Sequence, residues 1–316
     1  MAVVRRLLLA SPRGYCAGVE RAVETVERAL ALHGPPVYVR RQIVHNAHVV
    51  RDLERRGAVF VQHEDDVPEG ALLVLSAHGV APAVRERASK RRLRTIDATC
   101  PLVTKVHAGA KRYAAGGYTV VLVGRADHEE VEGTMGEAPE ATVLVETVAD
   151  AERVEIPAPS LVAYVTQTTL SVDETAEIVA TLRRRFPEIQ GPEAGDICYA
   201  TTNRQHAVKE LAAQIDLLLV IGSENSSNSN RLVEVGRAAG VESHLIEDET
   251  AIDERWLAGA EVVGLTSGAS APQQLVQRVC DWFRARGVQD VRSAGEVVED
   301  VLFRLPVQVR PALPAA

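Results

Sequence analysis

The 316-residue sequence contains no apolar run near the roughly 20 residues that a membrane-spanning helix needs. Its first apolar stretch, Leu7 to Ala10, is too short for the core of a secretion signal, and no small-residue cleavage site follows it. It also lacks an excess of positive charge, because the formal net charge is −8. A negative balance argues against nucleic acid as the main partner. We therefore expect a cytoplasmic protein with neither a membrane nor a nucleic-acid partner.

Cysteine is scarce, with only Cys16, Cys100, Cys198 and Cys280 in the whole chain. Four cysteines so far apart do not make the disulfide framework of a small secreted protein. No two of them form a C-x-x-C pair, so their spacing alone indicates neither a zinc motif nor a thioredoxin-like motif. Taken singly, each is expected to be a small buried hydrophobe, since free cysteine is among the most buried residue types.

Three of these cysteines have similar surroundings. They lie in SPRGYCAGVE, DATCPLVTKV and GDICYATTNR, where an extended segment ends at the cysteine and an amphipathic helical pattern begins at once. The intervals of 84 and 98 residues indicate three related units. We expect a first unit over 14–99, a second over 100–196, a third over 197–290, an N-terminal strand within 1–13 that joins the third unit's sheet, and an extended tail over 291–316.

Short buried runs alternate with helical patterns in every unit. The runs LLVL, TVVLV, LLLVI and EVVGL are typical of strands that are covered on both faces. Such alternation predicts an α/β fold with small, mostly parallel sheets. Ligands of open α/β sheets bind beyond the carboxyl ends of the strands. Three units around a common axis would therefore bring three cysteines and several polar clusters to one central cavity.

Three thiolates that meet at one point predict a metal centre, either iron–sulfur or zinc, because sulfur is a soft ligand that suits both. A position at a helix N-terminus is expected to favour each thiolate. Three protein ligands rather than four would leave a coordination position open for substrate. Cys280, inside the helical pattern QQLVQRVCDWF, is instead expected in the core.

Two stretches of small polar residues predict an anion site. SENSSNSNR and SGASAP each precede a helical pattern, and free amides with hydroxyl and amide side chains at helix starts bind phosphate groups. The pair suggests a ligand with two phosphates, to which His45 and His78 at strand ends could donate. The alternative is that the serines and asparagines only cap helices and that the histidines are structural.

The segment HEEVEG offers an acid near the same cavity, where a buried glutamate could deliver protons. Periodicity does not decide whether Glu129, Glu130 or Glu132 points inward, and all three could be solvated acids at a helix start. A later segment, TQTTLS at residues 166–171, could hydrogen-bond a substrate hydroxyl or merely cap a helix. Together these patterns predict a redox or lyase-type enzyme that acts on a small phosphorylated molecule.

Nine motifs, in order, carry a resemblance to one family. They are PRGYCAGVERA, VHN, SAHGV, DATCPLVTKVH, HEEVEGTMG, TQTTLS, DICYATTNRQ, GSENSSNSNR and GASAP. The chain resembles the LytB family of 4-hydroxy-3-methylbut-2-enyl diphosphate reductases from about residue 8 to about residue 306.

The resemblance implies a cloverleaf of three α/β units around a 4Fe–4S cluster held by Cys16, Cys100 and Cys198, with one open iron. It also implies a two-electron reductive dehydroxylation of (E)-4-hydroxy-3-methylbut-2-enyl diphosphate to isopentenyl and dimethylallyl diphosphate, the last step of the non-mevalonate isoprenoid pathway. A ferredoxin or flavodoxin would supply the electrons, and the chain is expected to be a monomer.

The resemblance also assigns roles to single residues. Glu130 corresponds to the proton donor and Thr168 to the residue that contacts the substrate hydroxyl, with His128 beside them. The implied diphosphate-binding residues are His45, His78, Ser226, Asn228 and Ser270, together with His128 and Ser227.

The chain departs from the family's usual pattern at Arg125, at Glu129, where many members have proline, and at Ser267, where alanine is common. Two alternatives stay open. One is a non-catalytic iron–sulfur sensor or phosphometabolite-binding paralogue, and the other is a zinc hydrolase or lyase.

Overall fold

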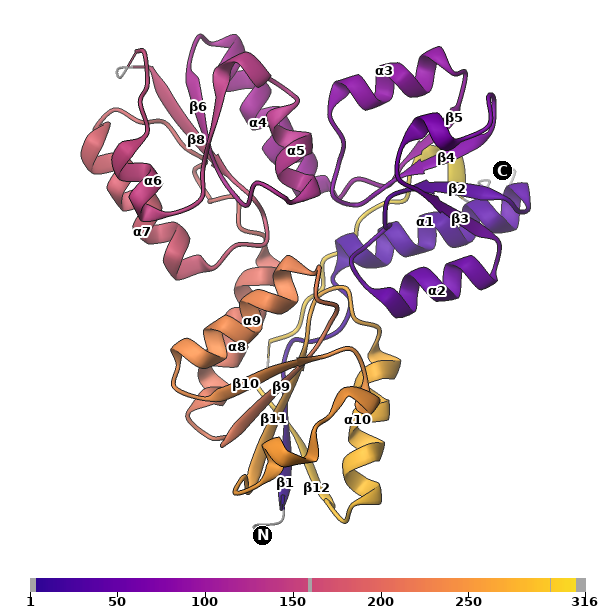
Figure 1. The fold of residues 1–316 in the computed structure, drawn as a ribbon, viewed down its shortest axis with the longest axis vertical. Helices are drawn as coiled ribbons and strands as arrows, with labels where there is room; N and C mark the ends of the chain where they lie inside the picture. Colours follow the sequence, from indigo (N-terminus) through magenta and orange to yellow (C-terminus); the bar gives the residue numbers. More distant parts are fainter. Residues whose placement is uncertain (1–3, 159–160, 296, 311–316) are drawn as a thin grey trace.

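The computed structural model describes residues 4–158, 161–295 and 297–310, and it has three lobes around a common centre (Figure 1). Each lobe contains one small parallel sheet with helices on its faces, so the predicted α/β class is confirmed. No helix within the described ranges is long and apolar enough to cross a membrane. The outermost parts of the predicted N-terminal segment and tail, residues 1–3 and 311–316, lie outside the described residues.

The first lobe is built on a four-stranded sheet in the order β3-β2-β4-β5. Every residue of β4 is buried, because alternate side chains face two separate cores. Helices α1 and α2 cover one face, and α3 covers the other. The elements are α1 (Ala17–His33), β2 (Val37–Arg40), α2 (Ala47–Arg55), β3 (Ala58–Val61), β4 (Leu72–Leu75), α3 (Pro82–Lys90) and β5 (Arg94–Asp97).

The second lobe has a three-stranded sheet in the order β7-β6-β8. Val121 and Val123 of β6 face one core, while Val120 and Leu122 face the other. The elements are α4 (Pro101–Ala115), β6 (Thr119–Val123), α5 (Glu129–Met135), β7 (Thr142–Val145), α6 (Val148–Arg153), β8 (Val162–Thr166) and α7 (Val172–Arg185).

The third lobe has a five-stranded sheet in the order β10-β9-β11-β1-β12. The N-terminal strand β1 pairs in parallel with β11 and β12, so it lies in the sheet where the sequence placed it. The elements are β1 (Arg6–Ala10), α8 (Tyr199–Ala212), β9 (Leu217–Ile221), α9 (Ser227–Ala238), β10 (Glu242–Ile246), β11 (Val262–Ser267), α10 (Gln273–Ala285) and β12 (Asp290–Ala294).

Strand β12 corrects one expectation. The extended tail was expected to start at residue 291, but residues 290–294 form the edge strand of the third sheet. This strand reads DVRSA and has no buried residue, so its sequence lacks the apolar run that marks the other strands. The other unit boundaries stay predictions.

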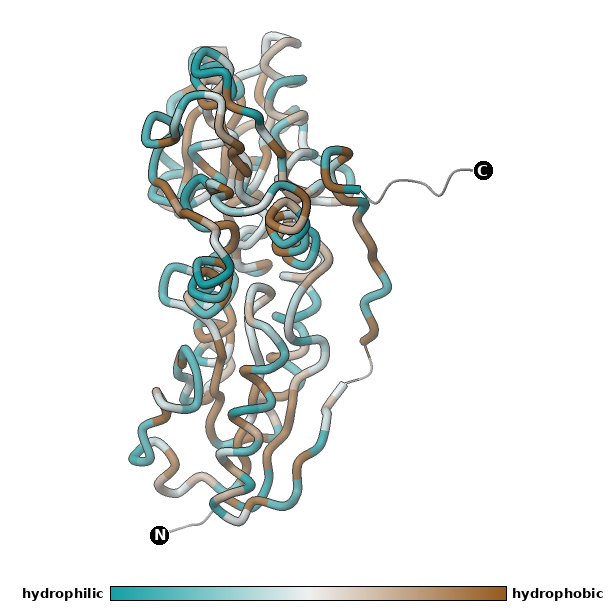
Figure 2. Tube along the Cα trace, turned by 90° about the vertical axis from the view of Figure 1, so that its right-hand side faces the viewer, coloured by the Kyte–Doolittle hydropathy of each residue, from teal (hydrophilic) through white to brown (hydrophobic). Residues whose placement is uncertain are grey.

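The tail proper, 297–310, runs outside the lobes from the third lobe to the first (Figure 2). Its far end is anchored by Val309, which is fully buried in the core beneath α1 and α2. Its near end is anchored by Glu299, which accepts hydrogen bonds from Asn203 and Arg204 of α8. The tail therefore connects two lobes that are far apart along the chain.

Arg204 is a fully buried cation that holds this junction together. Its guanidinium donates to the carbonyl of Gly14 at 2.8 Å, to the carbonyl of Ala200 at 2.9 Å and to the carboxylate of Glu299 at 3.0 Å. Burial of an unpaired charge is costly, so the carboxylate and the two carbonyls compensate for the water that Arg204 has lost.

We predict that Glu299→Ala lowers the free energy of unfolding by about 3–5 kcal/mol, because it leaves the Arg204 charge buried without its carboxylate. Urea unfolding followed by circular dichroism measures the change. The neighbouring Asp300→Ala, at an exposed position, is the matched control and should change stability by less than about 0.5 kcal/mol. Equal effects of the two substitutions would contradict the assigned role of Arg204.

Candidate active site

Three cysteines occupy the same structural position in the three lobes. Cys16, Cys100 and Cys198 are the N-cap residues of α1, α4 and α8, as the repeat predicts. In each case the cysteine amide donates to a carbonyl in the loop that follows a strand of another lobe. The three bonds are Cys16 to Ala269 at 3.2 Å, Cys100 to Ala77 at 3.0 Å and Cys198 to Thr168 at 3.0 Å.

The cysteines line one central cavity between the lobes. Cys280 lies elsewhere, in the core of the third lobe, as expected. The other residues that the sequence analysis selected all line the cavity, namely His45, His78, His128, Glu130, Thr168, Ser226, Ser227, Asn228 and Ser270.

The spacing of the three sulfur atoms bears on which metal group fits. Within the described residues, ligand atoms of three or more metal-binding side chains lie within 4.8 Å of one another only for His45, His78 and Glu129. At least one pair of the three sulfur atoms is therefore more than 4.8 Å apart. A single zinc ion with Zn–S bonds of about 2.3 Å would hold its sulfurs about 4 Å apart. The arrangement fits a group with several metal atoms better than one zinc ion.

Burial governs the protonation of the thiols. It raises the pKa of Cys100 to about 12 and that of Cys198 to about 11, and it also raises the pKa of Cys16. Backbone amides at the helix starts lower these values, as the sequence analysis expected, but burial outweighs them. Thiolates in this cavity therefore need bound cations to become stable, which is how metal binding and cysteine deprotonation are linked.

Gly18 allows two of the cysteines to approach. A Cβ atom at this position of α1 would lie 2.7 Å from the sulfur of Cys100 and 3.8 Å from that of Cys16. The first distance is shorter than van der Waals contact, so any larger residue would displace the sulfur. The glycine two residues after the first cysteine thus provides steric room for the sulfur of Cys100 rather than a special backbone angle.

Glu130 is the inward-pointing acid among the three candidate glutamates. It is 2% exposed, and its two carboxylate oxygens accept from the amide of Thr168 at 2.7 Å and from the hydroxyl of Thr168 at 2.9 Å. Burial raises the pKa of Glu130 to about 7, although these two hydrogen bonds oppose the shift. Glu132 instead is half-exposed and pairs with Arg41, and Glu129 faces His78.

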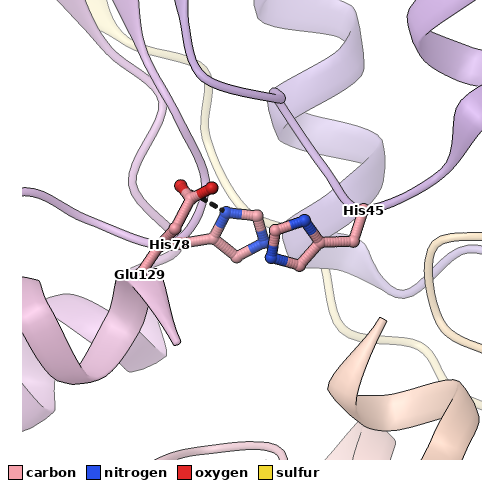
Figure 3. A group of neighbouring side chains, drawn as sticks. All are labelled: His45, His78 and Glu129. Atoms are coloured by element: carbon pink, nitrogen blue, oxygen red, sulfur yellow. Dashed lines mark ion pairs between the residues drawn. The ribbon is translucent and has the colours of Figure 1, made fainter. Parts of the chain in front are cut away.

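Three histidines form a cluster at the wall of the cavity. The rings of His45 and His78 stack at 4.0 Å between centroids, and the ring of His128 meets both edge-on. Figure 3 shows the stacked pair with Glu129 beside His78. Burial lowers the pKa of His45 to about 2 and those of His78 and His128 to about 4. All three are neutral near pH 7 when no anion is bound.

The serine- and asparagine-rich stretch both caps a helix and lines the cavity. Ser226 is the N-cap of α9 and accepts from the amide of Ser229. Asn228 donates to Thr201 and accepts from the amide of Ala269. The capping role and the cavity role, offered as alternatives by the sequence, therefore coexist in one segment.

Comparison with known proteins identifies the family. Residues 7–284 match the model of the LytB protein family. This chain belongs to the LytB family. The predicted resemblance is confirmed, and so is the expectation of an enzyme.

Named relatives cover almost the whole chain. A 4-hydroxy-3-methylbut-2-enyl diphosphate reductase from Acidothermus cellulolyticus is 58% identical over 98% of this chain and 92% of its own. A reductase of the same name from Mycobacterium ulcerans is 57% identical over 98% of this chain and 93% of its own. The solved structure of the E-1-hydroxy-2-methyl-but-2-enyl-4-diphosphate reductase from Plasmodium falciparum matches with a TM-score of 0.91 and 42% identity, covering 97% of both chains.

Several residues of this LytB-family cavity were missed by the sequence analysis. Thr169, Tyr199, Thr201 and Phe303 also line it. Thr201 lies beside Cys198, since its amide donates to the sulfur of that cysteine. Thr201 could have been predicted, because it lies one turn into a helix that starts at a cysteine. Phe303 reaches the cavity from the tail, and nothing in the sequence around it predicts this.

Ser267, one of the departures from the usual family pattern, has a structural role. Its buried hydroxyl accepts from the amide of Gly14 at 2.8 Å, across a separation of 253 residues. Alanine at this position could not make the bond. The serine therefore ties the loop that carries Cys16 to the end of β11.

We predict that Gly18→Ala lowers the iron and sulfide bound per chain by more than half, because the new methyl group would lie 2.7 Å from the Cys100 sulfur and displace it. Metal and sulfide analysis of anaerobically purified protein measures the loss. Gly109→Ala on α4 is the matched control, since its Cβ would make only an ordinary 3.5 Å contact with Val165. Unchanged iron content in Gly18→Ala would show that the sulfur has room to move.

Proposed function

We propose that this chain reduces (E)-4-hydroxy-3-methylbut-2-enyl diphosphate to isopentenyl diphosphate and dimethylallyl diphosphate. The observation that carries the proposal is the buried pair Glu130–Thr168, which lies in the same cavity as three cysteines at helix starts. An acid with a pKa near 7, a hydroxyl beside it and a metal site within one pocket suit a reaction that removes a hydroxyl group as water. Membership of the LytB family and the names of its relatives support the same reaction.

The proposed cofactor is one 4Fe–4S cluster held by Cys16, Cys100 and Cys198. The separation of more than 4.8 Å between at least one pair of the sulfurs supports this ligand set over a zinc ion. Such a cluster, when bound, supplies electrons and one iron without a protein ligand that polarises the substrate hydroxyl.

The diphosphate is proposed to bind between the histidine cluster and the start of α9. Ser226, Ser227 and Asn228 offer hydroxyl and amide groups there, and the free amides of the helix start add to them. Ser270 donates to the carbonyl of His45, so it also holds that histidine in place. Neutral donors fit a buried anion site, because they leave no unpaired charge when the site is empty.

Glu130 is proposed to deliver the proton that the departing hydroxyl needs. The reaction takes up two electrons and two protons, breaks the C4–O bond and releases one water molecule. A pKa near 7 lets Glu130 both give and regain a proton near neutral pH. Thr168 bonds both to Glu130 and, in this proposal, to the substrate hydroxyl, which joins donor and acceptor.

A non-catalytic sensor would need the cavity and the metal but not the acid. The contact between Glu130 and Thr168 favours an enzyme. Two hydrogen bonds orient the Glu130 carboxyl group, although the stability of the fold does not require a carboxyl group at this position. A buried acid with a raised pKa is a cost to folding above pH 4.5, because the unfolded chain would release its proton there and the folded chain would not. Such a cost is typical of functional sites.

A ferredoxin or flavodoxin as electron donor, a monomeric chain and a cytoplasmic location complete the proposal. They come from the family resemblance and from the sequence, and they stay predictions.

We predict that anaerobically purified, cluster-replete protein forms both products from the hydroxylated diphosphate with a reduced viologen dye.

Glu130→Gln should keep its iron but lose at least a hundredfold in turnover, because general acids contribute roughly 10²–10⁴-fold. Turnover of the unsubstituted protein should fall about tenfold per pH unit above pH 7, as Glu130 loses its proton. Absence of product from cluster-replete protein would favour the sensor, and normal turnover of Glu130→Gln would reject the proton donor.

We also predict that Cys100→Ser loses most of the bound iron and sulfide, whereas Cys280→Ser keeps both, because Cys280 packs among apolar side chains of the third lobe. Iron, sulfide and zinc are measured in each purified variant. Zinc in place of iron in the unsubstituted protein would instead support the hydrolase or lyase alternative.

A further inference from the structure

Two of the three clustered histidines have a hydrogen-bond donor at Nδ1. The Nδ1 atom of His128 accepts from the amide of Glu130 at 3.1 Å. The Nδ1 atom of His45 lies 3.2 Å from the side-chain nitrogen of Asn225 and 3.4 Å from the side-chain oxygen of Gln42, so it can accept from Asn225 in one neutral form or donate to Gln42 in the other. A ring whose Nδ1 accepts a hydrogen bond carries its proton on Nε2. Both neutral rings can therefore donate from Nε2 to an anion without gaining a proton.

His78 differs from these two. Its Nδ1 atom lies 3.5 Å from a carboxylate oxygen of Glu129 (Figure 3). Both side chains are only 15% exposed, and neither of these two atoms makes a hydrogen bond to any residue that the structure describes. A carboxylate only accepts hydrogen bonds, so it favours the form of His78 that carries its proton on Nδ1. The neutral ring then presents a lone pair on Nε2.

We propose that Glu129 is a positioning residue that holds the Nδ1 proton of His78, so that diphosphate binding adds a second proton to this histidine at Nε2. The proposal rests on the diphosphate site of the proposed function. A lone pair that faces a phosphate oxygen repels it, whereas an added proton from solvent turns the contact into a charge-assisted hydrogen bond. The resulting imidazolium lies between the phosphate and the Glu129 carboxylate.

The other charged groups around His78 explain why the second proton arrives only with the anion. Burial and the nearby Arg41 guanidinium lower the pKa of His78 to about 4, and the stacked His45 and the edge-on His128 are themselves neutral. Glu129 is the one carboxylate in ion-pair distance of His78 within the described residues. Before the diphosphate enters, a single carboxylate does not offset the loss of water and the repulsion by Arg41.

The same three residues do not form a cation site. The ligand atoms of His45, His78 and Glu129 lie within 4.8 Å of one another, but the two rings stack with only 15° between their planes. The nitrogen lone pairs of stacked rings lie in nearly parallel planes about one ring spacing apart, so they do not converge on one shared ion. The stacked geometry thus favours the anion-binding role.

Titration calorimetry with inorganic pyrophosphate tests the proposal on cluster-replete protein kept free of oxygen. Runs at pH 8 in buffers with different ionisation enthalpies give the number of protons taken up on binding. Glu129→Gln should take up fewer protons than the unsubstituted chain, by a difference that approaches one. The glutamine amide can donate to Nδ1 of His78, which favours the neutral form of this histidine that carries its proton on Nε2. Between pH 7 and 8.5 the affinity for pyrophosphate should also fall more steeply for the unsubstituted chain than for Glu129→Gln. One linked proton changes the affinity by up to about tenfold per pH unit.

A second variant and a matched control complete the test. Glu129→Pro removes the carboxylate and suits the first position of α5, where proline is well tolerated; it should behave like Glu129→Gln. Glu137→Gln changes another buried histidine–glutamate pair, His107–Glu137, which does not line the cavity. It should match the unsubstituted chain in proton uptake.

Each outcome decides between the alternatives. Equal proton uptake in the unsubstituted chain and in both Glu129 variants overturns the proposal, as does weaker binding at every pH without a change in uptake, which is the mark of a purely structural role. Failure of the unsubstituted chain to bind pyrophosphate would reject the diphosphate site itself, and the inference with it.

Discussion

The cavity depends on three backbone hydrogen bonds, each from the amide of a cysteine to a loop of another lobe. The lobes are connected in a ring by these bonds, since α1 of the first lobe is joined to the third, α4 to the first and α8 to the second. Each cysteine also stands where the chain passes from one lobe into the next. This holds for Cys16 only because β1 belongs to the third sheet. The N-terminal strand thus completes the threefold arrangement. If β1 belonged to the sheet of the first lobe, Cys16 would lie within one lobe instead of between two.

The ring arrangement determines the chemistry of the cavity, because three helix starts and three loops together bury the side chains that line it. Burial is the leading cause of every large pKa shift there, for the thiols, the histidines and Glu130. It favours the neutral form of the thiols and the histidines, so these groups carry no charge near pH 7. In the proposed function, charge enters with the ligands, as metal ions at the thiols and as diphosphate at the histidines. Glu130 is already poised near neutrality and needs no ligand to exchange its proton.

Much of this could be predicted from local sequence, and the parts that could not share a physical cause. Apolar runs predict the buried strands, and a cysteine before an amphipathic pattern predicts each helix start. The exposed edge strand β12 carries no such run, because one of its sides faces solvent. Ser267 and Arg204 act through contacts with Gly14 across 253 and 190 residues. Only the folded chain brings such partners together, and the same is true of the contact between Glu129 and His78.

Two arginines explain why the tail belongs to the site although it lies outside the lobes. Arg204 binds both Glu299 of the tail and the carbonyl of Gly14, two residues before Cys16. Arg21 binds both the carbonyl of Arg304 in the tail and the carbonyls of Ala98 and Thr99, directly before Cys100. A guanidinium has five donors in a rigid fork, so one side chain can orient two chain segments at once. The tail therefore braces the segments that precede two of the three cysteines, and it places Phe303 against the cavity between these two anchor points.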